Sequence, residues 1–274
     1  MGLAKRIQII GAHPDDCEYA CGGTAALWRQ AGSEVQFVSL TDGRSGHHVQ
    51  SGKELIDRRE KEAHAAASLI GASCTVLDIA DGHLEATLEN RLKVIRLIRE
   101  YQPDLVITNR PNDYHADHRY TAQLVQDASF LLRVPNVLPE VPALDQMPVI
   151  AYFWDAFQKP YPFDTDCAVA VDSVFKTKMQ QLAAHESQFL EWLPWLDGKL
   201  NEVPPASEPE ARLGWVTGYF NWLHSPSIAE REKDAIIQRY GEHSVDVIEQ
   251  VEAFEICEYG KQPLDDKFPE LFPK

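Results

Sequence analysis

Residues 6–16 read RIQIIGAHPDD, a short apolar run followed at once by a histidine and two adjacent aspartates. An apolar run that ends in glycine is typical of a buried parallel strand. Strand-like and helix-like patterns then alternate along the first half of the chain, which predicts a Rossmann-like α/β fold with a mostly parallel sheet. The further strands are expected at 34–40, 75–79 and 104–108, and the helices at 18–30, 55–70, 90–101 and about 117–132.

The second half of the chain is less regular. Strand-like patterns occupy residues 149–154, 167–171 and 250–259, and helix-like patterns occupy 173–185 and 227–240. Residues at about 190–225 are rich in tryptophan and proline, and we interpret them as an insertion. Tryptophans in such a segment more often build a core or an oligomer contact than a sugar platform. We predict a single domain over residues 1–274, with apolar surface on the insertion for self-association.

Composition and charge restrict the partners. The chain has 274 residues, of which 44% are hydrophobic, and a formal net charge of −16. Such a charge repels phosphate backbones and anionic lipids, which argues against nucleic acid or a membrane as partner. No apolar run reaches the roughly 18 residues of a membrane helix, and the N-terminus lacks a signal-peptide pattern, so we expect a cytoplasmic protein. The five cysteines lack zinc-ribbon spacing and fit free thiols.

A second polar cluster follows the expected strand 104–108, where residues 115–118 read HADH. In a doubly wound sheet ordered 3-2-1-4-5, strands one and four are neighbours, and their carboxyl ends flank the ligand-binding crevice. The two clusters should therefore meet. Histidine and aspartate are common zinc ligands, and a catalytic zinc keeps one position for water. Because two adjacent carboxylates cannot easily share one role, we expect one to bind metal and the other to act as general base.

Both clusters resemble signatures of the PIG-L/LmbE-like zinc-dependent N-acetylglucosaminyl deacetylase family. The first is AHPDD at 12–16 and the second is PNDYHADH at 111–118. The resemblance covers about residues 5–190 and 250–260 and implies an LmbE-like three-layer fold. Further elements fall in the family's order, and they are Thr41-Asp42-Gly43, Arg59 with Glu62 and Gly71, Asp81-Gly82-His83-Leu84, His185-Glu186-Ser187-Gln188 and Ala253-Phe254.

The resemblance assigns a set of metal ligands. His13, Asp16 and His118 match the family's zinc ligands. Fe²⁺, Co²⁺ or Ni²⁺ could also occupy a site of two histidines and one aspartate. We expect Asp117 to orient one of the ligand histidines, or to cap the following helix, rather than to bind the metal itself.

The resemblance also assigns residues to catalysis and to substrate binding. Asp15 matches the general base, for which the alternative is a helix N-cap. His115 matches the histidine that stabilises the oxyanion or protonates the amine, and the alternative is an ordinary loop histidine. Arg59 matches an arginine associated with substrate binding, with an ion pair to Glu62 as the alternative. Cys17 departs from the pattern, because the family usually has glutamate there.

These roles predict a zinc-dependent hydrolase that removes an N-acyl group, expected to be N-acetyl, from an amino-sugar conjugate. One alternative is an amidase that acts on a thiol conjugate or on a long-chain N-acyl substrate. Another is a non-catalytic sugar-binding protein on the same fold. The expected partner is a small N-acylated sugar or a related amide, and a homo-oligomer is an open alternative to a monomer.

Overall fold

The computed structural model describes residues 5–263 and 268–274, which contain a seven-stranded sheet in the order β3-β2-β1-β4-β5-β7-β6. The predicted order 3-2-1-4-5 is confirmed. β7 alone reverses the direction, because it pairs antiparallel with both β5 and β6. The strands are β1 (Arg6–Gly11), β2 (Glu34–Thr41), β3 (Ser73–Ile79), β4 (Leu105–Thr108), β5 (Val149–Phe153), β6 (Cys167–Ala170) and β7 (Val251–Ile256).

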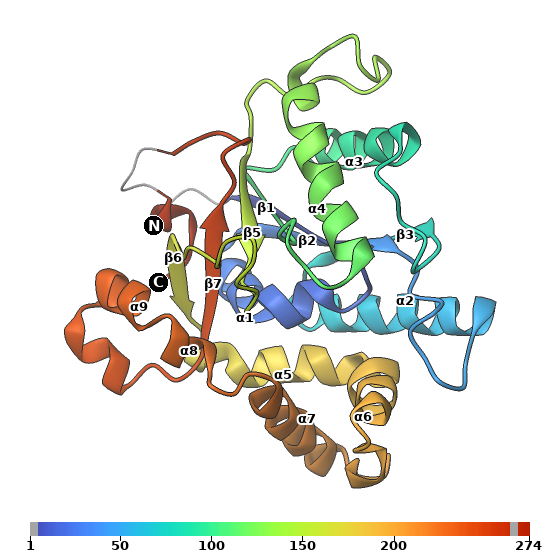
Figure 1. Cartoon of the computed structure of the whole chain (residues 1–274), viewed down its shortest axis with the longest axis vertical. Coiled ribbons are helices and arrows are strands. Elements are labelled where there is room, and N and C mark those ends of the chain that lie inside the picture. The colour runs from blue at the N-terminus through green and yellow to red at the C-terminus, as the bar shows by residue number, and fades with distance from the viewer. Residues whose placement is uncertain (1–4, 264–267) are drawn as a thin grey trace.

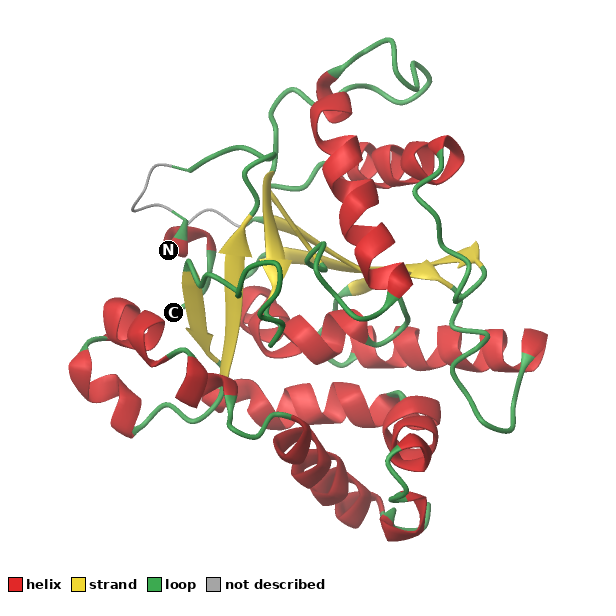
Figure 2. Cartoon of the chain, in the orientation of Figure 1, coloured by secondary structure: helices red, strands yellow, loops and turns green. Residues whose placement is uncertain are grey.

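Two helix layers cover the sheet (Figures 1 and 2). α1 and α2 pack on one face, and α3 and α4 pack on the other. α5 lies outside α1 and α2 and contacts both. This arrangement confirms the predicted three-layer α/β fold. The helices are α1 (Asp16–Gln30), α2 (Gly52–Ser68), α3 (Leu88–Tyr101), α4 (Ala116–Ser129) and α5 (Phe175–Ala184).

The alternation of side chains along β1 explains its apolar sequence. Ile7 and Ile9 join the core cluster that contains residues of α1 and α2. Ile10 points to the other face and joins the cluster built with α3 and α4. Because helices cover both faces, nearly every position of the strand is buried, and the strand ends at the point where the polar cluster begins.

A buried carboxylate joins α1 to the last strand of the sheet. The side chain of Glu252 in β7 accepts hydrogen bonds from the backbone N–H groups of Gly23 (2.9 Å) and Thr24 (2.7 Å) and from Lys178 Nζ (2.6 Å). A Cβ atom on Gly23 would lie 2.8 Å from Val171 and 3.1 Å from Glu252. The glycine therefore permits the close approach of helix and sheet.

The predicted insertion is helical. A π-helical turn (Gln188–Trp192) leads into α6 (Leu193–Leu196), and α7 (Pro209–Leu223) follows. Single 3₁₀ turns lie at Phe130–Arg133, Asp172–Val174, Leu200–Glu202, Glu242–Asp246 and Pro269–Leu271.

The prediction of one helix over 227–240 is wrong, because the segment forms α8 (Ile228–Arg231) and α9 (Lys233–Tyr240) with Glu232 between them. The Glu232 carboxylate accepts hydrogen bonds from Trp154 Nε1 (2.8 Å) and Thr165 Oγ1 (2.6 Å). These contacts accompany the non-helical backbone at Glu232. No helix among residues 5–263 and 268–274 is long and apolar enough to cross a lipid bilayer. A single domain over 1–274 stays a prediction.

Candidate metal centre and active site

The three predicted ligands come together at the carboxyl ends of β1 and β4. His13 Nδ1 lies 3.2 Å from His118 Nε2. Asp16 Oδ2 lies 3.6 Å from His13 Nδ1 and 3.5 Å from His118 Nε2. Zinc bonds of about 2.0–2.1 Å in a tetrahedron place neighbouring ligand atoms roughly 3.3–3.4 Å apart. The spacing of these nitrogen and oxygen atoms therefore fits one such cation.

Backbone hydrogen bonds fix the Asp16 carboxylate. Its Oδ2 atom accepts from the N–H groups of Ala12 (2.8 Å) and His13 (2.9 Å). Burial alone would raise the pKa of Asp16, but the nearby His118 and the hydrogen bonds with His13 outweigh it and lower the pKa. The group is therefore held as a carboxylate, which is the form that binds a cation.

Carboxylates behind the two histidines orient their rings. His13 Nε2 lies 3.3 Å from Asp81 Oδ1 and 3.4 Å from Asp117 Oδ2, and His118 Nδ1 lies 3.1 Å from Asp113 Oδ2. Histidines that ligate metal usually donate their second N–H to such a group. The structure places Asp117 beside His13 rather than His118, and its orienting role stays a prediction.

Asp81 and Asp113 were not assigned a role from the sequence. The signal that could have found them is position, since Asp81 follows β3 and Asp113 follows β4 at the same edge of the sheet. His13, Asp81 and Asp117 could themselves form a cation site. However, Asp81 Oδ2 accepts from the Ser45 N–H (3.2 Å), and Asp117 Oδ2 accepts from the Gly82 N–H (2.7 Å). These bonds favour an orienting role for both carboxylates.

Asp15 stands beside the cluster in a strained backbone conformation. Its φ of 140° lies in the region that favours glycine. Although it occupies the N-cap position of α1, its side chain makes no capping hydrogen bond within the described first turn. Burial raises the pKa of Asp15 to about 6, against the opposing charge of Arg59. A strained residue whose carboxylate has a raised pKa and makes no capping hydrogen bond is typical of a functional site.

Arg59 lies beneath Asp15 and is 2% exposed. Its Nη2 atom lies 3.3 Å from Asp15 Oδ2 and donates to the Pro14 carbonyl at 2.6 Å. A Cβ atom on Gly43 would lie 2.7 Å from the Arg59 side chain, so this loop packs directly on it. Glu62, the alternative partner, pairs with Arg58 instead. These contacts indicate that Arg59 acts on the charge and position of the Asp15 carboxylate. A contact of Arg59 with the substrate stays a prediction.

His115 is the N-cap of α4, and its ring faces His13 edge-on at 4.6 Å between centroids. Its Nδ1 atom accepts a hydrogen bond from the Asp117 N–H at 3.2 Å. Burial lowers the pKa of His115, and the charges of His13 and His118 lower it further. The ring is therefore neutral near pH 7 and carries its proton on Nε2, as a hydrogen-bond donor.

The departure at Cys17 has a structural explanation. The Cys17 side chain is buried under the sheet and donates to the Ile9 carbonyl at 3.3 Å. Glu18, one position later, points to the other side and lies 3.3 Å from His185 Nε2. Neither residue replaces one of the three candidate ligands.

The part of the loop after β2 that contains Gly46, His47 and His48 is held by contacts with residues 188–195. Gln188 Nε2 donates to the Gly46 carbonyl at 2.9 Å, and His47 Nε2 lies 2.8 Å from Glu191 Oε2. His48 stacks on Trp195 with 4.9 Å between centroids and 8° between planes. At least this tryptophan of the 190–225 segment therefore packs against the loop.

Known proteins resemble the chain in sequence and fold. The model of the family described as PIG-L, GlcNAc-PI de-N-acetylase, matches residues 8–129. Diacetylchitobiose deacetylase of Thermococcus kodakarensis is 31% identical over 205 residues, which are 70% of this chain and 75% of that protein. The chain belongs to the PIG-L family.

Another relative of this PIG-L family member has a different named activity. The 4-oxalmesaconate hydratase of Pseudomonas putida is 27% identical over 156 residues, which are 54% of this chain and 60% of that protein. Among solved structures, N,N′-diacetylchitobiose deacetylase from Pyrococcus horikoshii matches with a TM-score of 0.68 and 24% identity. The match covers 94% of this chain and 85% of the Pyrococcus horikoshii chain. This likeness confirms the LmbE-like fold.

Proposed function

We propose that this PIG-L family protein is a zinc-dependent deacetylase, which hydrolyses the N-acetyl group of an amino-sugar conjugate. The observation that carries the proposal is the Asp15 carboxylate, which pairs with Arg59 and caps no helix N–H, beside three suitably spaced ligand atoms of His13, Asp16 and His118. The relative from Thermococcus kodakarensis, named a diacetylchitobiose deacetylase, supports the substrate class. When bound there, zinc supplies Lewis acidity that polarises an amide carbonyl and lowers the pKa of water.

The residues of the chain would divide the work as follows. Asp15 takes a proton from the attacking water, while the new C–O bond forms at the amide carbon. His115 donates its Nε2–H to the oxygen on which negative charge develops. The C–N bond then breaks, and Asp15 returns the proton to the departing amine. The products are acetate and a free amino sugar, and the carboxylate and imidazole end the cycle as they began.

The direct test measures acetate release from N-acetylated sugars by the zinc-loaded protein, with Asp15→Asn as the matched variant. We expect Asp15→Asn to keep its zinc and to lose about 10²–10⁴ in rate, the usual contribution of a general base. His13→Ala and His118→Ala should purify with less zinc. Full activity in Asp15→Asn would overturn its role, and undiminished zinc in both histidine variants would overturn the ligand set.

The relative named a hydratase makes hydration of a carbon–carbon double bond a second candidate. The same base could remove a proton from water before it adds to such a bond. However, five aspartates gather here, namely Asp15, Asp16, Asp81, Asp113 and Asp117. Such a crevice disfavours a polycarboxylate substrate more than a neutral sugar amide. Loss of ultraviolet absorbance from a conjugated dienoic acid, without acetate release, would favour hydration instead.

A further inference from the structure

An exposed aromatic side chain stands beside the candidate metal centre. Tyr114, on the loop after β4, is 74% exposed, although it comes directly before His115. Its ring lies 5.8 Å from that of His115 and 5.7 Å from that of His118, with 85° and 76° between the planes. A large ring that faces solvent at this position offers apolar area to a molecule bound at the metal centre.

A second aromatic ring extends this surface. β5 lies beside β4 in the sheet, with Tyr152 paired to Thr108, so the loops that follow the two strands are neighbours. Phe157, on the loop after β5, lies 6.1 Å from Tyr114 between ring centroids, with 48° between the planes. We call Tyr114 and Phe157 the aromatic rim. It begins at the candidate metal centre and continues onto the loop after β5.

Two arginines hold the backbone of the aromatic rim. Arg119 Nη1 donates to the Tyr114 carbonyl at 3.0 Å. Arg110 Nη2 donates to the Phe157 carbonyl at 3.0 Å, and the same guanidinium, which is buried, donates two hydrogen bonds of 2.8 and 2.7 Å to Asp155. Both rings therefore stand on anchored loops, and the aromatic rim is preorganised for a ligand.

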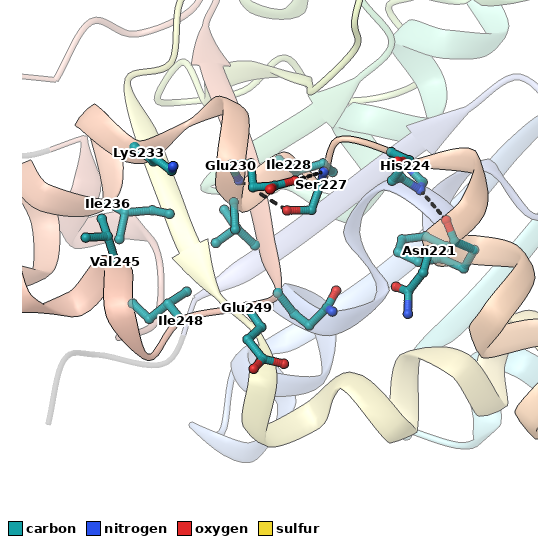
Figure 3. Close-up of a pocket in the computed structure, with 15 residues that line it drawn as sticks. Asn221, His224, Ser227, Ile228, Glu230, Lys233, Ile236, Val245, Ile248 and Glu249 are labelled. Atoms are coloured by element: carbon teal, nitrogen blue, oxygen red, sulfur yellow. Dashed lines mark hydrogen bonds between the residues drawn. The ribbon is translucent and has the colours of Figure 1, made fainter.

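The cavity between the end of α7, α8 and the start of β7 is separate from this surface. It has a volume of about 400 Å³, with His224 and Asn221 on one side (Figure 3). The His224 ring packs 5.2 Å from Tyr19 and 6.3 Å from Trp154. Because these packed rings separate the cavity from Asp15, a molecule in the cavity does not reach the candidate base, whereas the aromatic rim adjoins the metal centre.

The chemistry of the aromatic rim suits a ring with an apolar face. The face of an aromatic ring carries partial negative charge, and the C–H bonds on the face of a saturated ring carry partial positive charge, so the two attract each other. An acetyl group has a single methyl group to offer. The aromatic rim therefore fits the group on the nitrogen side of the amide, which is the larger part of an amino-sugar conjugate.

We propose that Tyr114 is a specificity-determining residue, which stacks on the ring attached to the amide nitrogen, and that Phe157 extends this contact. The protein then selects N-acetylated amines whose nitrogen is carried by a ring over those whose nitrogen is carried by an open chain. Tyr114 takes no part in the proton transfers, so it acts on substrate binding. This assignment rests on the proposed deacetylase function.

The test measures kcat and KM for acetate release from N-acetylglucosamine and from N-acetylethanolamine, which has the same amide on an open chain. The variants are Tyr114→Ala, Tyr114→Phe and Phe157→Ala. The control is Tyr259→Ala, because Tyr259 is 58% exposed but follows β7, which runs antiparallel to β5 and ends at the opposite edge of the sheet.

Wild type and control should both favour N-acetylglucosamine. Because a stacking contact is lost, Tyr114→Ala should raise KM for N-acetylglucosamine about three- to tenfold, with kcat unchanged and no effect on N-acetylethanolamine. Tyr114→Phe should keep most of the preference. An unchanged KM in Tyr114→Ala, or an equal loss on both substrates, overturns the proposal.

Two further measurements keep the proposal open to refutation. Zinc content is measured for each variant, because Tyr114 adjoins His115. Should Tyr114→Ala lose zinc, Phe157→Ala decides, since a raised KM for N-acetylglucosamine supports the aromatic rim and an unchanged KM refutes it. Should wild type release no acetate, the deacetylase function fails by itself. Calorimetric titration of the zinc-loaded protein with N-acetylglucosamine then decides: binding that Tyr114→Ala weakens and Tyr259→Ala does not supports the aromatic rim, and equal or absent binding refutes it.

Discussion

Replacing Arg59 by methionine tests which of two roles the guanidinium has. It either lowers the pKa of Asp15 or binds the substrate directly. The charges of Arg59 and Asp15 are 3.3 Å apart and largely buried. At an effective dielectric constant of about 20, this distance corresponds to about 5 kcal/mol of attraction. Desolvation of both groups offsets part of it, and an adjacent arginine typically lowers the pKa of an aspartate by about 1–3.

The sign of the effect follows from the role of Asp15 as base. Burial raises its pKa to about 6 even with Arg59 present. Because only the ionised carboxylate accepts a proton, activity is lost as pH falls through this pKa. Removing the positive charge raises the pKa further, so the acid limb of kcat/KM should move to higher pH by about 1–3 units. A bound cation shifts the pKa of Asp15 in wild type and in Arg59→Met alike. The quantity to measure is therefore the difference in the position of the acid limb between the two proteins.

The assay is a pH profile of acetate release for wild type, Arg59→Met, Arg59→Lys and Arg58→Met. Arg58 is the matched control, because it is the next residue on α2 but pairs with Glu62 and Glu191. Arg59→Lys should restore part of the shift, and Arg58→Met should leave the acid limb in place. A higher KM in Arg59→Met with an unmoved acid limb would refute the reasoning and favour direct substrate contact.

Three further predictions concern the site and its support. His115→Ala should lower kcat about 10²–10³-fold while the zinc content by mass spectrometry stays unchanged; loss of zinc would contradict a donor role. Asp113→Asn should weaken zinc affinity about 10–100-fold in a chelator competition, and unchanged affinity would show that it does not support His118. Gly23→Ala should destabilise the fold by about 1–3 kcal/mol in urea unfolding, because its Cβ would meet Val171 at 2.8 Å. Gly214→Ala, where a Cβ meets nothing within 4 Å, is its control, and equal effects would refute the packing argument.

The order of the first five strands follows from local pattern, because apolar strands and amphipathic helices alternate up to β5. That order alone brings His13 and His118 to one edge of the sheet. Two of the three carboxylates behind them are not indicated by local pattern. Asp81 and Asp113 stand in loops without periodicity, and only the folded sheet shows that their side chains reach the histidine rings.

The second half departs from prediction where tertiary contacts override local preference. Residues 227–240 have a continuous helical pattern, but the non-helical turn at Glu232 coincides with its hydrogen bonds to Trp154 and Thr165, which are distant in sequence. No property of the individual residues indicates that Asn221 and Gln250 line one cavity, since 28 residues and two α-helices lie between them.

The carboxylate of Glu252 also bears on the order of folding. It bonds to the Gly23 N–H across 229 positions of sequence, and to the Thr24 N–H across 228. Long loops close slowly, and contacts of such separation form late. All three candidate zinc ligands are synthesised within the first 118 residues, yet the two hydrogen bonds that join α1 to Glu252 form only after β7 has emerged from the ribosome. A nascent chain stopped before β7 should therefore hold zinc more weakly than the finished protein.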